Sequence, residues 1–408
     1  MDEFKYRDGA LHAEDVPVAR IAAEVGTPSY VYSRRTIEEH YRRVVEAFRG
    51  VDVLVCYSVK ANSNLSLLSL LDGLGSGFDV VSVGEIERAL RVGADPKRIV
   101  FAGVGKAEAE IRRALELGIL MFNVESEQEL EVVDANARAL GRKAPISIRV
   151  NPDVDPRTHK YISTGKEENK FGIDLERARA LVGRLPGFGS TELRGIHMHI
   201  GSQITDVEPY RVAVGKVVGF ARECREAGHP IEWVNTGGGF GIYYRGGEAL
   251  PASAFAERIV PPVAGAGFKL ILEPGRFIVG NAGILLTRVQ YVKEGGKKTF
   301  VICDAGMNDL IRPSLYSAYH RIWPARCDQP PPTGQDTTEG LVLTDVVGPI
   351  CESGDFLALD RPLPAVRRGD LLAVFSAGAY GSTMSSNYNT RPRAAEVLVE
   401  GDRFRVVR

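Results

Sequence analysis

Lys60 is the first residue whose type and place in the chain suggest chemistry. Residues 53–57 are apolar and partly β-branched, which predicts a buried strand, and Lys60 follows where that strand should end. A half-buried ammonium group loses solvation, so its neutral form becomes able to form an imine with a carbonyl compound. An ordinary surface lysine is the alternative, and this stretch by itself does not decide between the two.

Three later segments carry groups that could bind a cofactor: residues 197–203, 235–241 and 273–276. They contain two histidines, three consecutive glycines, and Glu273 close to Arg276. The glycines Gly237, Gly238 and Gly239 add nothing to a core, but they let backbone N–H groups approach an anion such as phosphate. Such a triplet is most often a tight turn, so the phosphate role depends on where the fold places it.

The elements that must position these groups are eight short apolar runs, which alternate with amphipathic segments. The runs lie at 53–57, 78–81, 99–101, 121–124, 146–150, 196–200, 231–234 and 270–272, and helical spacing occurs at 106–117, 126–140, 209–227 and 253–264. Eight strand–helix units in about 250 residues predict a closed (β/α)₈ barrel of the TIM type, with its site at the C-terminal strand ends. An open doubly wound sheet is the alternative. In the barrel the glycine triplet follows strand seven, where phosphate commonly binds, and this favours the phosphate role.

The residues that follow the last predicted barrel strand show a different pattern, with little helical periodicity. Short strand-like runs at 287–292, 299–303, 340–347, 371–375 and 395–399 are separated by Gly, Pro and Asp turns, which predicts an all-β domain. The expected domains are therefore a cofactor-binding barrel over 27–279 and a C-terminal β domain over 280–408, which residues 1–26 are expected to join. Residues 327–338, with three consecutive prolines, are expected to form a loop.

Composition narrows the class of partner. The 408 residues are 44% hydrophobic and 25% charged, with a formal net charge of -1, which gives no electrostatic reason to expect nucleic acid or an anionic membrane. The N-terminus shows no signal-peptide pattern, and no window approaches the roughly 20 apolar residues of a membrane span. We expect a soluble, cytoplasmic protein that acts on a small molecule.

Histidines and cysteines give no sign of a metal site. His197 and His199 alternate on one predicted strand, so one ring should face the strand-end pocket or the barrel interior and the other the helices. The five cysteines are scattered and form no CxxC pair, which argues against a disulfide framework or a zinc site. A free thiol with a function remains open.

Lys60, the glycine triplet and Glu273 at one barrel mouth indicate a pyridoxal 5'-phosphate site. A carboxylate against the pyridine nitrogen keeps that nitrogen protonated, so the ring can accept the electron pair released when a bond to Cα breaks. This favours decarboxylation, whereas a racemase would place a cation there. An aldolase-type barrel would need no such carboxylate, and a non-enzymatic cofactor-binding barrel would lack the C-terminal domain.

Several motifs in the same order resemble the pyridoxal phosphate-dependent group IV decarboxylases of the alanine-racemase fold (fold type III), and most of all their diaminopimelate decarboxylase branch. The resemblance is carried by residues 56–62, 199–202, 237–239, 273–276, 307–313, 351–355, 380–384 and 389–393. It implies decarboxylation of meso-2,6-diaminopimelate to L-lysine and CO₂, the last step of lysine biosynthesis. A decarboxylase of another basic or carrier-bound amino acid, or a racemase-like protein, stays open.

The resemblance also implies roles for single residues. Lys60 would bind the cofactor covalently, His199 would lie against its ring and Glu273 would pair with its nitrogen. The cofactor-binding set would further include Ser202, Gly237, Gly238, Gly239, Gly275, Arg276 and Tyr380. The substrate would be held by Arg276, Arg312, Tyr316, Glu352 and Tyr380. Cys351 would donate the proton to Cα, and with Glu352 it would come from the other subunit of a homodimer with shared active sites. A buried small hydrophobe is the alternative for Cys351.

Two arginines in this set favour diaminopimelate as the substrate. A substrate ending in an amine would leave Arg276 and Arg312 without a carboxylate, and a buried unpaired charge costs about 3 kcal/mol or more. Related enzymes that act on basic amino acids tend to have an acid in place of Arg312. A distal centre that bears both an amine and a carboxylate would satisfy Glu352 and the arginines together.

Overall fold

The computed structural model describes residues 2–155, 170–245, 249–295, 298–329, 331 and 340–408. The chain divides into two compact units, each described here by itself. The first contains Met1–His40, Ile242–Ala249 and Arg276–Arg408, and the second contains Tyr41–Gly241 and Leu250–Gly275. The expected domain boundaries at residues 27 and 280 stay a prediction.

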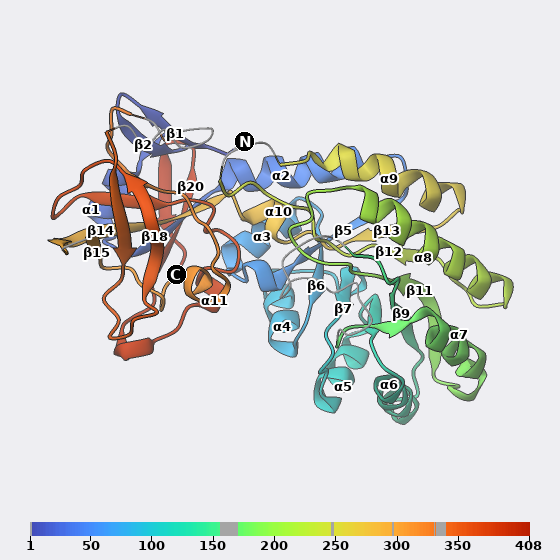
Figure 1. Cartoon of the computed structure of the whole chain (residues 1–408). Helices are drawn as coiled ribbons and strands as arrows, with labels where there is room; N and C mark the ends of the chain where they lie inside the picture. Colours follow the sequence, from blue (N-terminus) through green and yellow to red (C-terminus); the bar gives the residue numbers. More distant parts are fainter. Residues whose placement is uncertain (1, 156–169, 246–248, 296–297, 330, 332–339) are drawn as a thin grey trace. The chain divides into compact units, whose positions relative to one another are not determined.

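Eight parallel strands close into a barrel in the second unit (Figure 1). In order around the ring they are β5 (Val53–Ser58), β6 (Gly77–Val80), β7 (Ile99–Phe101), β8 (Met121–Val124), β9 (Ala144–Asn151), β11 (Thr191–His197), β12 (Trp233–Asn235) and β13 (Lys269–Leu272), which pairs again with β5. The short strand β10 (Ile173–Asp174) pairs with β9 outside the ring. The predicted (β/α)₈ barrel is confirmed, and the open sheet is excluded.

Amphipathic helices surround the strands (Figure 1). They are α3 (Leu65–Gly73), α4 (Val83–Arg91), α5 (Glu108–Leu117), α6 (Glu127–Ala139), α7 (Leu175–Arg184), α8 (Glu208–Glu226) and α9 (Ala252–Gly265). At the start of α6, Ser126 Oγ accepts a hydrogen bond from the N–H of Glu129 at 3.2 Å, as expected of an N-cap. The Glu129 carboxylate accepts from the N–H of Glu125, at 2.9 Å, so only half of a capping box forms.

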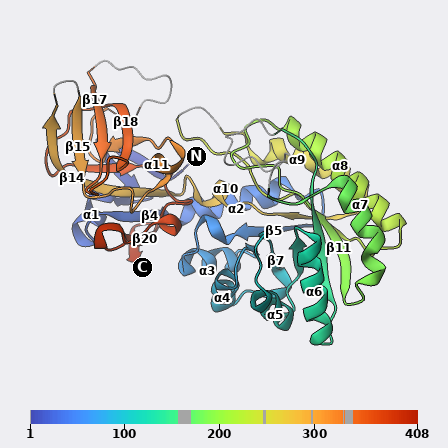
Figure 2. The ribbon, with the colours of Figure 1, turned by 60° about the horizontal axis from the view of Figure 1, so that its bottom comes forward.

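The first unit is built around a mixed sheet in which most strand pairs are antiparallel. Its strands are β4 (Ser29–Ser33), β14 (Gly283–Glu294), β15 (Thr299–Cys303), β16 (Ile322–Pro324), β17 (Val342–Val347), β18 (Phe356–Leu363), β19 (Leu371–Val374), β20 (Ala395–Glu400) and β21 (Arg403–Val406). They run in the order β18-β17-β15-β14-β4-β20-β21, and β19 pairs with both β14 and β16. Figure 2 shows β14, β15, β17 and β18 side by side. Three short helices complete the unit: α1 (Val18–Glu24), α10 (Arg276–Val279) and α11 (Arg312–Tyr316). The predicted all-β C-terminal domain is confirmed.

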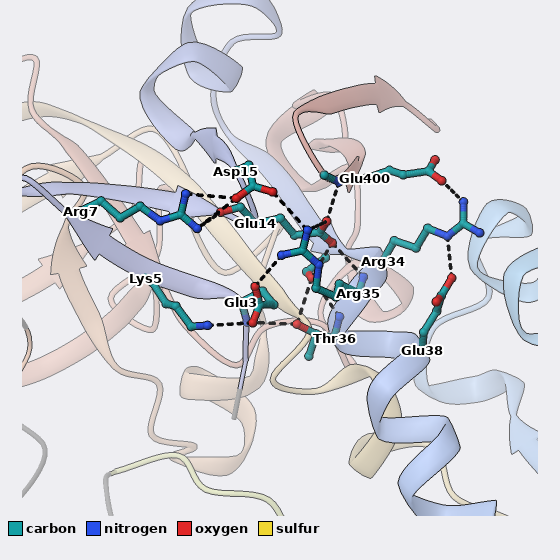
Figure 3. A network of polar contacts seen from close by, with 12 residues as sticks. Glu3, Lys5, Arg7, Glu14, Asp15, Arg34, Arg35, Thr36, Glu38 and Glu400 are labelled. Carbon is teal, nitrogen blue, oxygen red and sulfur yellow. Dashed lines mark hydrogen bonds and ion pairs between the residues drawn. The ribbon is translucent and has the colours of Figure 1, made fainter.

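The N-terminal residues belong to this sheet unit. Strands β1 (Phe4–Arg7), β2 (Ala10–Ala13) and β3 (Val16–Pro17) form a small antiparallel sheet, while β4 pairs with β14 and β20. The buried carboxylate of Glu14 accepts hydrogen bonds from Ser33 Oγ at 2.8 Å, from the N–H of Arg35 at 2.8 Å and from the N–H of Gly401 at 2.6 Å. Figure 3 shows Glu14 and Arg35 in this network. One carboxylate thus connects the N-terminal turn, the start of α2 (Arg34–Ala47) and the turn between β20 and β21.

Two further expectations concern membrane-spanning helices and the loop at residues 327–338. Within the described ranges, no helix has both the length and the apolar character needed to cross a membrane. Most of the loop expected at residues 327–338 lies outside the described residues.

Candidate active site

Lys60 lies in a single 3₁₀ turn, Val59–Ala61, that follows β5 at the C-terminal end of the barrel. Its Nζ donates to Asp79 Oδ2 at 2.6 Å, and 41% of its side chain is exposed. Asp79, on β6, is completely buried and also accepts a hydrogen bond from Ser58 Oγ at 2.6 Å. The side chain of Lys60 is therefore partly buried, and a buried carboxylate stabilises its ammonium form.

Asp79 is a site residue that the sequence reasoning missed. Burial raises the pKa of this carboxyl group and the charge of Glu273 raises it further, whereas Lys60 opposes both effects. A buried acid held between a carboxylate and an amine is a common feature of functional sites. The available signal was an aspartate inside the apolar run 78–81, where a charge is costly to bury.

Glu273 follows β13 at the same end of the barrel, and its carboxylate is held from three sides. Oε1 accepts from Asn123 Nδ2 at 3.1 Å and from Asn235 Nδ2 at 2.6 Å, and Oε2 lies 3.3 Å from His197 Nε2. Desolvation raises the pKa of Glu273, but the contact with His197, the charge of Lys60 and the Asn235 hydrogen bond outweigh it and lower the pKa. The carboxylate is therefore ionised at neutral pH, as a partner for a protonated pyridine nitrogen must be.

Asn123 and Asn235 were not singled out from the sequence either. Each lies at or near the end of a buried strand, where an amide side chain must find a partner. Ser147 Oγ donates to Asn123 Oδ1 at 2.6 Å, and Asn235 Oδ1 accepts from the N–H of Gly237 at 2.9 Å. Asn235 thereby connects the acid to the glycine triplet.

The rings of His197 and His199 do not point in the opposite directions that strand alternation predicts. Strand β11 ends at His197, so the period of two does not extend to His199. A Cβ on Gly237 would lie 2.7 Å from His199 Nδ1, which places that ring against the triplet. Burial, with the charges of Arg149 and Lys60, lowers the pKa of His199 to about 3, while Glu273 opposes the shift. Both rings therefore lie near the acid, and the expectation that one would face the helices is wrong.

The backbone conformation and close packing of residues 237–239 require glycine. The same turn leaves backbone N–H groups free to donate hydrogen bonds. Gly237 and Gly239 have φ values of +66° and +103°, and a Cβ on Gly238 would lie 2.1 Å from the carbonyl oxygen of Glu273. Among the described residues, the N–H groups of Gly238 and Gly239 donate to no other group. The triplet is thus a tight turn that also offers backbone donors, which fits a phosphate.

The barrel therefore brings together the predicted cofactor residues Lys60, His199, Gly237, Gly238, Gly239 and Glu273 at one end. Gly275 allows close contact beside them, because a Cβ there would lie 2.9 Å from Ala61 Cβ and 3.0 Å from Ser58 Cβ. Ser202 follows β11 and is partly buried. The predicted roles of these residues toward a cofactor stay predictions.

The first unit gathers a second group of predicted residues. Arg276 begins α10 and Arg312 begins α11, and the guanidinium of Arg276 stands 4.9 Å from the ring centroid of Tyr380. Tyr316 ends α11 and is partly buried. Within the described part of the chain neither guanidinium has a carboxylate partner, and the buried Nε–H of Arg312 donates to no acceptor. Such a pair is suited to an external carboxylate.

Cys351 and Glu352 lie on an exposed turn. The exposure of Cys351 excludes the alternative of a buried small hydrophobe. Its N–H donates to Asn389 Oδ1 at 3.1 Å, and a hydrogen bond with Glu352 raises the pKa of Tyr388.

Comparison with known proteins gives the same family throughout. Residues 34–280 match the model of the pyridoxal-dependent decarboxylases, pyridoxal binding domain. Diaminopimelate decarboxylase of Pseudomonas aeruginosa is 51% identical over 408 residues, which is 100% of this chain and 96% of the relative; that of Aquifex aeolicus is 50% identical over 99% of this chain and 94% of the relative. The crystal structure of diaminopimelate decarboxylase from Helicobacter pylori complexed with L-lysine has a TM-score of 0.90 at 44% identity, covering 96% of each chain.

Proposed function

Because the chain belongs to the pyridoxal-dependent decarboxylase family, we propose how its own residues carry out the family reaction. As in the diaminopimelate decarboxylases that are about half identical to this chain, the reaction is the pyridoxal 5'-phosphate-dependent decarboxylation of meso-2,6-diaminopimelate to L-lysine and CO₂. The observation that carries the proposal is the buried, ionised carboxylate of Glu273 at the same barrel end as the amine of Lys60. A lysine and an ionised acid so placed match the two ends of a pyridoxal ring.

The barrel residues are proposed to hold the cofactor. Bound pyridoxal phosphate supplies an electron sink for the pair that remains on Cα when CO₂ leaves. Lys60 would bind the cofactor through Nζ, and Glu273 would keep a proton on the ring nitrogen. The neutral ring of His199 would lie against the cofactor, and the free N–H groups of Gly238 and Gly239 would bind its phosphate together with Ser202.

The arginines are proposed to hold the distal carboxylate of the substrate. Arg312 is buried, and among the described residues neither it nor Arg276 has a carboxylate partner, so an incoming carboxylate would remove an unsatisfied charge. Tyr316 and Tyr380 would complete this binding surface, and Glu352 would accept from the distal amine. Arg276 and Tyr380 would also contact the cofactor.

A substrate panel tests this function. We expect kcat/KM for meso-diaminopimelate to exceed that for ornithine or arginine by at least about a hundredfold, because only meso-diaminopimelate offers a distal carboxylate to the arginines. Release of CO₂ and formation of L-lysine are the measurements. Arg312→Ala should reduce the ratio, whereas Arg288→Ala, whose guanidinium bonds the surface carbonyl of Gly369, should not. Equal rates on all substrates would contradict the assignment.

We further propose a homodimer in which Cys351 and Glu352 complete the partner's active site. Their exposure on one turn supports this, because both side chains are accessible to a second copy. Cys351 would donate its thiol proton to Cα after CO₂ has left. We also propose that the enzyme acts in the cytoplasm, in keeping with five unpaired cysteines.

A further inference from the structure

The hydroxyl oxygen of Tyr244 is the point at which the two arginines meet. Arg276 donates to it from Nη1, and Arg312 donates from Nη1 at 3.1 Å. The two guanidinium carbons also stand 5.9 Å and 5.4 Å from the centroid of the Tyr244 ring. One tyrosine therefore contacts both arginines through its oxygen and through its ring. All three residues belong to the first unit.

The neighbouring histidine adds no charge to this group. The ring of His320 meets the Tyr244 ring edge-on at 5.4 Å, and its Nε2 lies 3.2 Å from Arg312 Nη1. Burial and the charge of Arg312 lower the pKa of His320 to about 3, so its ring is neutral at physiological pH. Among the described residues, the two guanidiniums are then the charged groups that face the Tyr244 hydroxyl.

Two cations on one phenol change the chemistry of that phenol. Desolvation raises the pKa of Tyr244, but the charges of Arg276 and Arg312 and the hydrogen bonds they donate outweigh it, so the pKa lies below its usual value. A polarised or ionised phenol offsets part of the repulsion between two guanidiniums that have no carboxylate between them. Tyr244 thus occupies the electrostatic position that a bound carboxylate would otherwise fill.

We propose that Tyr244 is a positioning residue that fixes the spacing of Arg276 and Arg312, so that both bind the distal carboxylate of the substrate at once. The inference rests on the proposed function, which assigns these arginines to that carboxylate. A guanidinium carries five N–H donors, so the bond to Tyr244, together with the contact of Arg312 to His320, still leaves at least three donors on each arginine for a carboxylate. Bidentate binding depends on how the donors are oriented, and Tyr244 sets that orientation for both arginines.

Tyr244→Phe tests the inference by removing only the hydroxyl group. We expect KM for meso-diaminopimelate to rise about 10- to 100-fold while kcat changes little, because hydrogen bonds to charged groups orient the arginines for binding and not for bond cleavage. Tyr243→Phe is the matched control: the Tyr243 hydroxyl bonds Asp2 and not an arginine, so KM should stay unchanged.

A spectroscopic titration of the apoprotein gives a second reading that does not depend on turnover. The absorbance of tyrosinate should show one phenol that ionises below the usual pH of about 10 in the wild type and in Tyr243→Phe, and this phenol should be missing in Tyr244→Phe. Burial and Asp2 raise the pKa of Tyr243, so that control removes a phenol from the high end of the titration.

The KM values and the tyrosinate titration together distinguish an error in the role of Tyr244 from an error in the proposed function. A wild type active on meso-diaminopimelate, with unchanged KM and an unchanged titration in Tyr244→Phe, would overturn the role of Tyr244 and leave the function standing. A wild type inactive on meso-diaminopimelate would contradict the proposed function. Loss of the low-pH phenol in Tyr244→Phe would in that case still support the arginine–tyrosine pairing. Unfolding curves of each variant establish that the comparison is between folded proteins.

Discussion

Lys60→Ala is expected to abolish decarboxylation of meso-diaminopimelate, with kcat/KM falling by at least about 10⁴-fold. The reason is that Lys60 lies at the barrel end that holds Glu273 and the glycine triplet, and a methyl group cannot bind a carbonyl cofactor. The measurement is CO₂ release, together with the visible absorbance of the purified protein, which should be lost.

Two control variants show whether the amine itself is needed. Lys60→Arg keeps a cation beside Asp79, so it should preserve the ion pair and still be inactive. Lys97→Ala removes an exposed lysine of the same unit and should leave activity unchanged. Substantial activity in Lys60→Arg would mean that Lys60 contributes only its charge, and the covalent role would be wrong.

Mixing Lys60→Ala with Cys351→Ala should restore activity from two inactive proteins. If each active site combines Lys60 of one subunit with Cys351 of the other, a mixed dimer contains one intact site and one doubly altered site. Random exchange makes half of the dimers mixed, so about a quarter of the sites should recover. CO₂ release is followed after incubation under conditions in which subunits exchange.

Two controls show whether the recovered activity comes from an intact shared site. Lys60→Ala mixed with a protein that carries both substitutions can form no intact site and should stay inactive. Cys327→Ala removes another cysteine of the same unit and should remain active by itself. If the mixed sample gains nothing although exchange is demonstrated, Cys351 serves its own subunit or has no catalytic role.

The architecture could be predicted because its signal is local. Every barrel strand overlaps an apolar run, and β7 and β8 begin and end where the pattern placed them, whereas β11 shares only residues 196–197 with the run at 196–200. Lys60 and Glu273 could be found for the same reason, since each follows such a run within three residues and strand ends are where a barrel keeps its site.

Other features depend on partners that are far apart in the sequence. Strand β4 lies within residues 27–279, the range predicted for the barrel. Its residue Val31 nevertheless pairs with Ile284 and Val397, more than 250 residues away. Nothing in its local pattern distinguishes a strand of one sheet from a strand of another.

The supporting side chains were missed for a related reason. Asp79, Asn123 and Asn235 are polar residues in or at the end of buried strands, and only the closed ring shows which acid or amine each one reaches. Tyr244 precedes Arg276 by 32 positions and Arg312 by 68, and no periodicity connects them. For such residues a polar side chain in an apolar run is the useful signal, because burial obliges it to find a partner.

We expect Lys60 to bind an aldehyde cofactor whose ring nitrogen faces Glu273. Borohydride reduction of the purified protein, followed by peptide mass analysis, locates the lysine that binds the cofactor. We expect a phosphopyridoxyl group on the peptide that contains Lys60 and on no other lysine. A protein that binds the cofactor but carries the label on a different lysine, with Lys60 unmodified, would contradict it.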